Sequence, residues 1–180
     1  MDQSNRIPGE QCQNRALLLL GSNAEDAVRA LAEARNSLAE ETAVLKEGSL
    51  WRTAAWGFEG PDFVNQVVEV CWEGPLDALM RFALETEKRM GRVRNPSANA
   101  YENRRIDMDV ILWSGGEYRS DLLTVPHPRM HLRRFVLQPL VEFWADWTHP
   151  IENLSVQELL ARCGDENLVH LHTTTEKKHP

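Results

Sequence analysis

The longest uninterrupted run of apolar residues in this chain lies at residues 16–20, and its length limits what the chain can form. A membrane-spanning helix needs about 18 or more such residues, so this run is far too short for one. A short apolar run that ends at a Gly-Ser-Asn turn, here residues 21–23, is typical of a buried strand. We therefore expect a globular protein with a buried strand at residues 15–20 and no membrane partner.

The rest of the chain alternates between helical and strand patterns. Helical spacing of apolar residues predicts a helix from residue 27 to about 41, and Ser22 and Glu25 have the spacing of a capping box before it. Ser155 and Glu158 have the same spacing before a later helix. The further predicted elements are strands at 44–53, 63–72 and 106–113, helices at 75–90, 132–143 and 155–163, and loops at 54–62 and 92–105. The order strand, helix, strand, strand, helix, strand predicts a ferredoxin-like α+β fold, a split βαβ sandwich with helices packed on a mainly antiparallel sheet.

The length of 180 residues predicts one domain, which we place at residues 15–164. Residues 1–14 show no periodicity and no apolar secretory core, so we expect a disordered extension without a signal peptide. Residues 165–180 are polar, and we expect this C-terminal tail to fray.

Charge and cysteine content exclude two further classes. Twenty basic against twenty-seven acidic side chains give a net charge of −7, whereas a general nucleic-acid binder of this size is usually basic. The three cysteines, Cys12, Cys71 and Cys163, are too few and too scattered for a disulfide framework or a thiolate metal site. We expect them to be reduced thiols of a cytoplasmic protein.

Two aspartates share one face of the predicted strand at 106–113. Alternation points Ile106, Met108, Val110 and Leu112 into the core, which leaves Asp107 and Asp109 together on the opposite face, with Cα atoms about 7 Å apart. Adjacent carboxylates repel each other unless a cation lies between them, and hard oxygen ligands suit Mg²⁺ ions that also bind phosphate. The alternative is a pair of solvated aspartates on an exposed sheet face.

A cluster of basic residues precedes these aspartates. Between residues 88 and 105 the only acid is Glu102, whereas the bases are Lys88, Arg89, Arg92, Arg94, Arg104 and Arg105. Arginine side chains bind phosphate oxygens through two parallel hydrogen bonds, although loop arginines are often merely solvated. Beside two aspartates, the cluster predicts a site for a polyphosphate–metal complex.

Other polar residues suggest contacts to a nucleotide and to a flat ring. His127 and His131 are four residues apart, but no third ligand supports a zinc site, so we interpret His127 and Arg133 as phosphate or nucleotide contacts. Asn65 interrupts an apolar strand, and its amide could either satisfy local backbone groups or bind a heterocycle as donor and acceptor. Phe135 and Tyr101 could supply stacking faces. The sequence contains neither a Walker phosphate loop nor a serine or cysteine nucleophile elbow.

Six motifs resemble those of the 6-hydroxymethyl-7,8-dihydropterin pyrophosphokinase family of folate biosynthesis. They follow the family's order between about residues 17 and 150 and are LGSN at 20–23, WRT at 51–53, PDFVN at 61–65, GRVR at 91–94, RRIDMD at 104–109 and VPHP at 125–128. The combination of the fourth and fifth motifs is the most specific. The resemblance implies a cytoplasmic, monomeric enzyme that transfers the β,γ-diphosphate of ATP to the hydroxymethyl oxygen of the pterin and releases AMP.

The resemblance also implies a role for each matching residue. Asp107 and Asp109 would bind two Mg²⁺ ions, and Arg92 and Arg104 would stabilise charge on the transferred group. The residues that would bind ATP are Arg94, Thr124, His127 and Arg133. Those that would bind the pterin are Thr53, Trp56, Phe63, Asn65, Tyr101 and Phe135. The alternatives are another Mg²⁺-dependent phosphoryl or nucleotidyl transferase and a non-catalytic nucleotide-binding module on the same fold.

Overall fold

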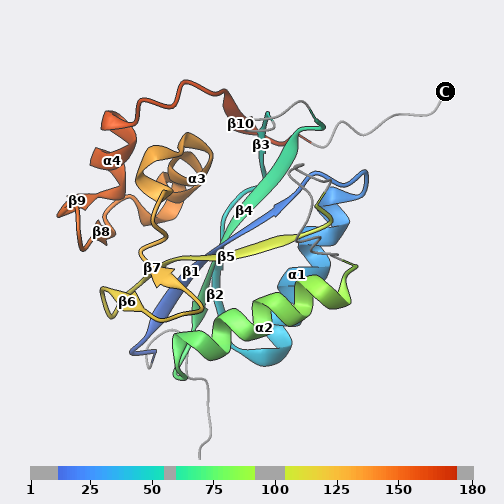
Figure 1. Ribbon diagram of the computed structural model, residues 1–180. Helices are drawn as coiled ribbons and strands as arrows, with labels where there is room; N and C mark the ends of the chain where they lie inside the picture. The colour runs from blue at the N-terminus through green and yellow to red at the C-terminus, as the bar shows by residue number, and fades with distance from the viewer. Residues whose placement is uncertain (1–11, 55–59, 92–103, 174–180) are drawn as a thin grey trace, which may run out of the picture.

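The computed structural model describes residues 12–54, 60–91 and 104–173, which form a central sheet with helices on both faces (Figure 1). The middle strand, β1 (Arg15–Ser22), pairs antiparallel with β4 (Phe63–Cys71) on one side and with β5 (Asp107–Trp113) on the other. Beyond β4 lie β2 (Val44–Glu47), β3 (Trp51–Thr53) and β10 (Val169–Leu171), in the strand order β10-β3-β4-β1-β5 with β2 also paired to β4. Two small hairpins join β6 (Tyr118–Arg119) to β7 (Thr124–Val125) and β8 (Thr148–His149) to β9 (Leu154–Ser155).

Each face of the sheet is covered by a pair of helices (Figure 1). Helices α1 (Ala27–Glu41) and α2 (Leu76–Arg89) cover one face, and α3 (Arg134–Trp144) and α4 (Val156–Arg162) cover the other, with a 3₁₀ turn η1 (Met130–Leu132) before α3. Leu18 and Leu20 of β1 point toward α1 and α2, whereas Leu17 and Leu19 point toward α3 and α4. Burial on both faces explains why β1 is continuously apolar, and the arrangement confirms the ferredoxin-like α+β fold.

Two local predictions from the sequence are wrong. The segment 44–53 forms two strands, because regular pairing with β4 stops after Glu47 and resumes at Trp51. Between them, the Gly48 N–H donates to the Val67 carbonyl of β4 at 2.8 Å. Ser22 and Glu25 do not form a capping box: the Ser22 Oγ accepts from the Ala24 N–H, and α1 begins only at Ala27. The second box is confirmed, since the side chains of Ser155 and Glu158 each bind the other's backbone N–H.

Strand β5 contains an irregularity that alternation could not predict. Leu18 of β1 lies opposite Val110, but Leu17 lies opposite Leu112. Ile111 is therefore an extra residue on β5 at this point, which is a β-bulge. Leu112 therefore packs with Leu17 under α3 and α4, not with Met108 and Val110 as the sequence predicted. The bulge lies beyond Asp109, so both aspartates keep the shared face that the alternation predicted.

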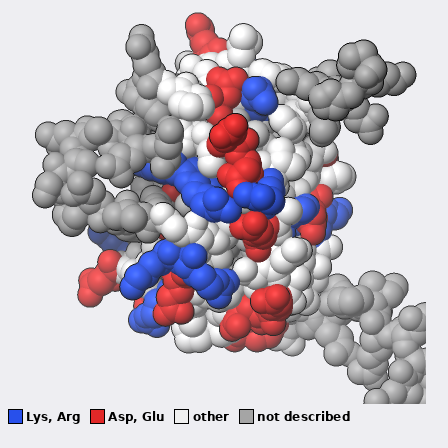
Figure 2. All heavy atoms as spheres, turned by 90° about the vertical axis from the view of Figure 1, so that its right-hand side faces the viewer, with Lys and Arg blue, Asp and Glu red and all other residues white. Residues whose placement is uncertain are grey.

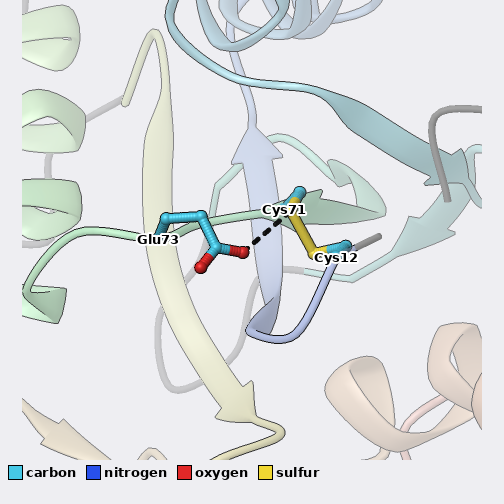
Figure 3. Close-up of side chains that lie close together, drawn as sticks. All are labelled: Cys12, Cys71 and Glu73. Carbon is cyan, nitrogen blue, oxygen red and sulfur yellow. Dashed lines mark hydrogen bonds between the residues drawn. A yellow bond between two sulfur atoms is a disulfide. The ribbon is translucent and has the colours of Figure 1, made fainter. Parts of the chain in front are cut away.

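The N-terminal segment is fixed to the sheet by a disulfide between Cys12 and Cys71, whose Cα atoms are 5.6 Å apart (Figure 3). The prediction of reduced thiols is wrong for this pair, and Cys163 is the free cysteine. The pairing follows from the register, because Arg15 lies opposite Cys71 and the chain just before Arg15 passes the end of β4. Glu73 Oε1 lies 3.5 Å from the Cys71 sulfur, but sulfurs bonded to each other cannot serve as thiolate metal ligands (Figure 3).

Both ends of the described chain are more ordered than the sequence suggested. Residues 12–14 are held by the disulfide and by the Asn14 carbonyl, which accepts from the Trp72 N–H at 2.8 Å. Residues 169–171 form β10 on the outer edge of β3, so the expectation of a fraying tail is wrong for this stretch.

The described residues on the face shown in Figure 2 carry charges of both signs, and the described helices include no candidate membrane span. On that face, basic and acidic side chains lie interleaved, which fits a chain of net charge −7 (Figure 2). Among the described residues, every helix is too short or too polar to traverse a bilayer.

Candidate active site

A cavity of about 320 Å³ lies between the sheet and the start of α3. Its walls come from β1, β3, β4 and β5 and from the segment that leads through η1 into α3. The cavity brings together the predicted site residues Thr53, Phe63, Asn65, Arg104, Asp107, Asp109, His127, Arg133 and Phe135. Residues far apart in the sequence, with both charges and aromatic rings among them, therefore share one pocket.

The floor of the cavity is set by a row of paired residues across three strands. Gly21 of β1 lies opposite Asn65 of β4 on one side and opposite Asp107 of β5 on the other. Directly paired residues project to the same face of a sheet, so only a glycine separates the Asn65 amide from the Asp107 carboxylate. A Cβ at position 21 would lie 2.8 Å from Asn65 Oδ1, which shows how closely the two sides approach this glycine.

Asp107 and Asp109 both line the cavity, and Arg104 holds the first of them. The Arg104 guanidinium donates to Asp107 Oδ2 at 2.9 Å, and the Asp107 side chain is only 14% exposed. Asp109 lies opposite Leu19 of β1, two residues after Asp107 and on the same face of β5. The site thus presents two carboxylates on one rigid strand beside a guanidinium.

The Gly-Ser-Asn segment at the end of β1 fixes the backbone of Arg104. Asn23 Oδ1 accepts from the Arg104 N–H at 2.7 Å, and the Arg104 carbonyl accepts from the Asn23 N–H at 3.2 Å and from the Ser22 hydroxyl at 3.4 Å. Ser22 and Asn23 are both buried. This motif therefore positions the arginine that reaches Asp107.

Two described basic residues near Arg104 bind side chains at α1 and are not part of the cavity lining. Arg105 lies 3.3 Å from Asp26 and 3.3 Å from Glu33 of α1. Arg89 donates to the Ser37 hydroxyl of α1 at 2.9 Å. The basic cluster seen in the sequence is thus divided, with Arg104 in the site and Arg89 and Arg105 bound to α1.

The β3 and β4 side of the cavity is lined by polar groups and by an aromatic ring, and α3 adds a second ring. The Asn65 amide donates to the Thr53 hydroxyl at 2.9 Å, and both side chains are buried. Phe63 of β4 and Phe135 of α3 line the same cavity. This side can hold a flat ring whose edge meets an amide and a hydroxyl.

His127 and two arginines form the rim nearest α3. The His127 N–H donates to the Ile111 carbonyl at 2.9 Å, and its Nδ1 accepts from the Arg129 N–H at 3.3 Å. Burial of the ring, followed by the positive charges of Arg133 and Arg129, lowers the pKa of His127 to about 4. The imidazole is therefore neutral at pH 7, and its proton is assigned to Nε2 because Nδ1 accepts. The Arg133 guanidinium lies 5.6 Å from the centre of the Phe135 ring.

Comparison with known proteins identifies the family of this chain. The profile of the 7,8-dihydro-6-hydroxymethylpterin-pyrophosphokinase family matches residues 17–145, which contain every residue of the cavity. The chain belongs to this family. It is 34% identical over 136 residues to a 2-amino-4-hydroxy-6-hydroxymethyldihydropteridine pyrophosphokinase of Porphyromonas gingivalis, covering 74% of this chain and 92% of that protein. It is 30% identical over 153 residues to the Synechocystis protein of the same name, covering 84% of this chain and 76% of that one.

Solved structures support the fold alone. The crystal structure of Plasmodium falciparum HPPK-DHPS wild type with pteroate superposes with a TM-score of 0.62 at 13% sequence identity and covers 83% of this chain. The match takes in 44% of that longer chain, so this chain spans less than half of it.

Some family residues predicted from the sequence are not in the described cavity. Thr124 lies on β7 opposite Arg119 and is not part of the lining. Trp56, Arg92, Arg94 and Tyr101 lie outside the described residues. His131 does not join His127 in a zinc site; its ring packs edge-on against His149 at 5.8 Å.

Six residues of the lining were not predicted from the sequence. They are Leu19, Gly21, Ala54, Ile111, Arg129 and Val136. Strand alternation would have placed Leu19 and Gly21 on one face of β1, but nothing in the sequence says which face meets α3. Arg129 adds a third guanidinium to the cavity beside Arg104 and Arg133.

Proposed function

We propose that this chain transfers the diphosphate group of ATP to 6-hydroxymethyl-7,8-dihydropterin and releases AMP, as a step of folate biosynthesis. The observation that carries the proposal is the row Asn65, Gly21 and Asp107, which sets a ring-binding edge beside a pair of carboxylates in one cavity. An acceptor hydroxyl bound at the first end would face a polyphosphate bound at the second. Such transfer depends on positioning and charge stabilisation, so a covalent nucleophile is not required.

The residues at the carboxylate end fit Mg²⁺. Asp107 and Asp109 offer oxygen donors from one strand face, which is the ligand chemistry that Mg²⁺ prefers, and phosphate oxygens complete such sites. We assign both side chains to two Mg²⁺ ions, which when bound would neutralise polyphosphate charge and align the reacting groups. Three guanidiniums in the cavity, those of Arg104, Arg129 and Arg133, would balance the remaining phosphate charge.

The remaining side chains bind and orient the two substrates. Arg104 stabilises the charge on the transferred phosphoryl oxygens, because its backbone is fixed and its guanidinium already lies at Asp107. His127, neutral with a proton on Nε2, donates to ATP. Asn65 and Thr53 hydrogen-bond the pterin edge, and Phe63 and Phe135 hold its faces. From the family motif, we also assign Arg92 to the transferred group, Arg94, Thr124 and Arg133 to ATP, and Trp56 and Tyr101 to the pterin.

The test is to incubate the protein with ATP, Mg²⁺ and the hydroxymethyl pterin and to identify the products. AMP and the pterin diphosphate are expected. ADP would indicate a simple kinase, pyrophosphate a nucleotidyl transferase, and ATP binding without turnover a binding module; each of these results contradicts the proposal.

Substitution of the aspartates tests the metal assignment. Asp107→Ala and Asp109→Ala are each expected to abolish AMP formation and to leave the circular dichroism spectrum unchanged, because a metal ion loses a ligand. Wild-type activity of either variant at limiting Mg²⁺ would contradict the two-ion site.

We further propose that the predicted domain at residues 15–164, with β10 completing its sheet, is the pyrophosphokinase domain of a monomeric, cytoplasmic enzyme. Light scattering of the purified chain tests the monomer. Fractionation of native cells tests the location: recovery of the chain in the cytosolic fraction is expected, and recovery outside that fraction would contradict the proposal.

A further inference from the structure

Glu87 is a buried carboxylate that the proposed mechanism does not use. It lies in the last turn of α2 and is only 1% exposed. Its Oε1 accepts from the backbone N–H of Met108 at 2.8 Å. Met108 is fully buried and is the residue between Asp107 and Asp109. A carboxyl side chain from a helix is therefore bound to the backbone between the two aspartates of the site.

The pairing of β5 explains why this amide needs a partner from outside the sheet. Asp107 lies opposite Gly21, and Asp109 lies opposite Leu19 of β1. In an antiparallel pair, the backbone groups of successive residues point alternately to the two edges of the strand. Since the Met108 N–H points to Glu87, the backbone groups of Asp107 and Asp109 point to β1.

The outer edge of β5 has no neighbouring strand in the described sheet. A buried backbone N–H without a partner is strongly unfavourable, and Glu87 supplies the acceptor that a further strand would otherwise provide. β1 thus fixes the two aspartates from one edge of β5, and Glu87 fixes the residue between them from the other edge.

We propose that Glu87 is a positioning residue for the metal-binding aspartates: its hydrogen bond to Met108 holds the backbone from which Asp107 and Asp109 project. The proposal rests on the proposed function, since it takes these two side chains as the Mg²⁺ ligands. If Glu87 positions the aspartates, loss of its acceptor oxygen weakens metal binding. If Glu87 only supports the fold, the same loss lowers stability but leaves the metal affinity unchanged.

The chain offers a matched control in a second buried carboxylate. Glu69 of β4 is 6% exposed, accepts from Trp144 Nε1 at 2.8 Å and pairs with Arg15 at 3.2 Å. It lies opposite Leu17, four residues along β1 from the Gly21 row. Glu69→Met and Glu87→Met each remove a buried carboxylate at similar side-chain volume, but only the second change touches the strand that carries the aspartates.

The experiment measures Mn²⁺ binding to the full chain by electron paramagnetic resonance, with a non-transferable ATP analogue present, beside a thermal melt of each variant. We expect both Met variants to melt earlier than the wild type. We expect Glu87→Met to bind Mn²⁺ at least about tenfold more weakly and Glu69→Met to bind it like the wild type. Glu87→Gln keeps an oxygen acceptor at the same place, so it should bind more tightly than Glu87→Met.

Unchanged Mn²⁺ affinity in Glu87→Met, or an equal loss in Glu69→Met, would overturn the proposal. If Glu87→Met does not fold, Glu87→Asp decides the question, because it withdraws the carboxylate by one methylene; wild-type affinity in that variant overturns the proposal, and weakened affinity supports it. The double variant Asp107→Ala/Asp109→Ala separates this inference from the proposed function. If the double variant binds Mn²⁺ like the wild type, the assignment of the metal to these aspartates fails, whatever Glu87 does.

Discussion

Gly21 determines how far apart the two ends of the cavity lie. It separates Asn65 from Asp107 in the sheet, and a Cβ there would lie 2.8 Å from Asn65 Oδ1, closer than a Cβ approaches an oxygen to which it is not bonded. Gly21→Ala should therefore displace the Asn65 amide from Thr53 and raise the KM for the pterin about tenfold, with a smaller change in the KM for ATP. Steady-state kinetics would measure both. Gly164→Ala is the control, because nothing lies within 4 Å of a Cβ at that position.

His127 should make the stability of the fold depend on pH. Its pKa is lowered from 6.5 to about 4 in the folded state, chiefly by burial. Between those two values the unfolded chain binds more protons at this residue than the folded chain does, so stability rises with pH there and is lost as pH falls through the window. His127→Gln removes this contribution.

Urea unfolding of the wild type and of His127→Gln at pH 7 and pH 4.5 measures the difference. The free energy of unfolding of the wild type should fall more between these pH values than that of the variant. An equal fall in both proteins would contradict a lowered pKa, since the other histidines titrate alike in each.

At the scale of elements, the described basic residues near the end of α2 and the start of β5 lie on two surfaces. Arg104 turns to Asp107, whereas Arg89 and Arg105 bind side chains of α1. Arg104→Ala should lower kcat by about 10³-fold with little change in KM, as expected for an arginine that stabilises transferred phosphoryl charge. Arg89→Ala and Arg105→Ala should remain within tenfold of the wild type. Single-turnover kinetics would check this, and equal losses in all three would show that the cluster only attracts ATP.

The sequence predicted correctly those features that local periodicity determines, and it failed where contacts with other elements decide the structure. Alternation correctly placed Asp107 and Asp109 on one face of β5, but it misplaced Leu112, because a bulge is set by pairing with β1 and not by the strand's own pattern. Similarly, the spacing of Ser155 and Glu158 was sufficient for a cap, whereas that of Ser22 and Glu25 was not. Ser22 instead donates to the Arg104 carbonyl, a tertiary contact that no local pattern reveals.

At the scale of the whole molecule, the order of elements was enough to predict the fold, and nine of the residues named from the sequence line the cavity. Neither the order of elements nor the family resemblance predicted individual contacts between distant segments. Glu87 reaches Met108 across the junction of α2 and β5, and Cys12 reaches Cys71 across 59 residues. Neither pair has a sequence pattern of its own, because each depends on how strands and helices are packed together.

The disulfide between Cys12 and Cys71 should contribute to the stability of the fold but not to catalysis. It closes a loop of 59 residues, for which the chain-entropy model gives a stabilisation of up to about 4 kcal/mol. It lies at the Arg15 end of β1, and Gly21 lies six residues further along, about 20 Å away. Reduction with dithiothreitol should therefore lower the free energy of unfolding in urea by a few kcal/mol and leave kcat unchanged. The double variant Cys12→Ser/Cys71→Ser should match the reduced wild type and should not respond to dithiothreitol. A loss of kcat on reduction, in protein that remains folded, would show that the N-terminal segment influences the site through the length of β1.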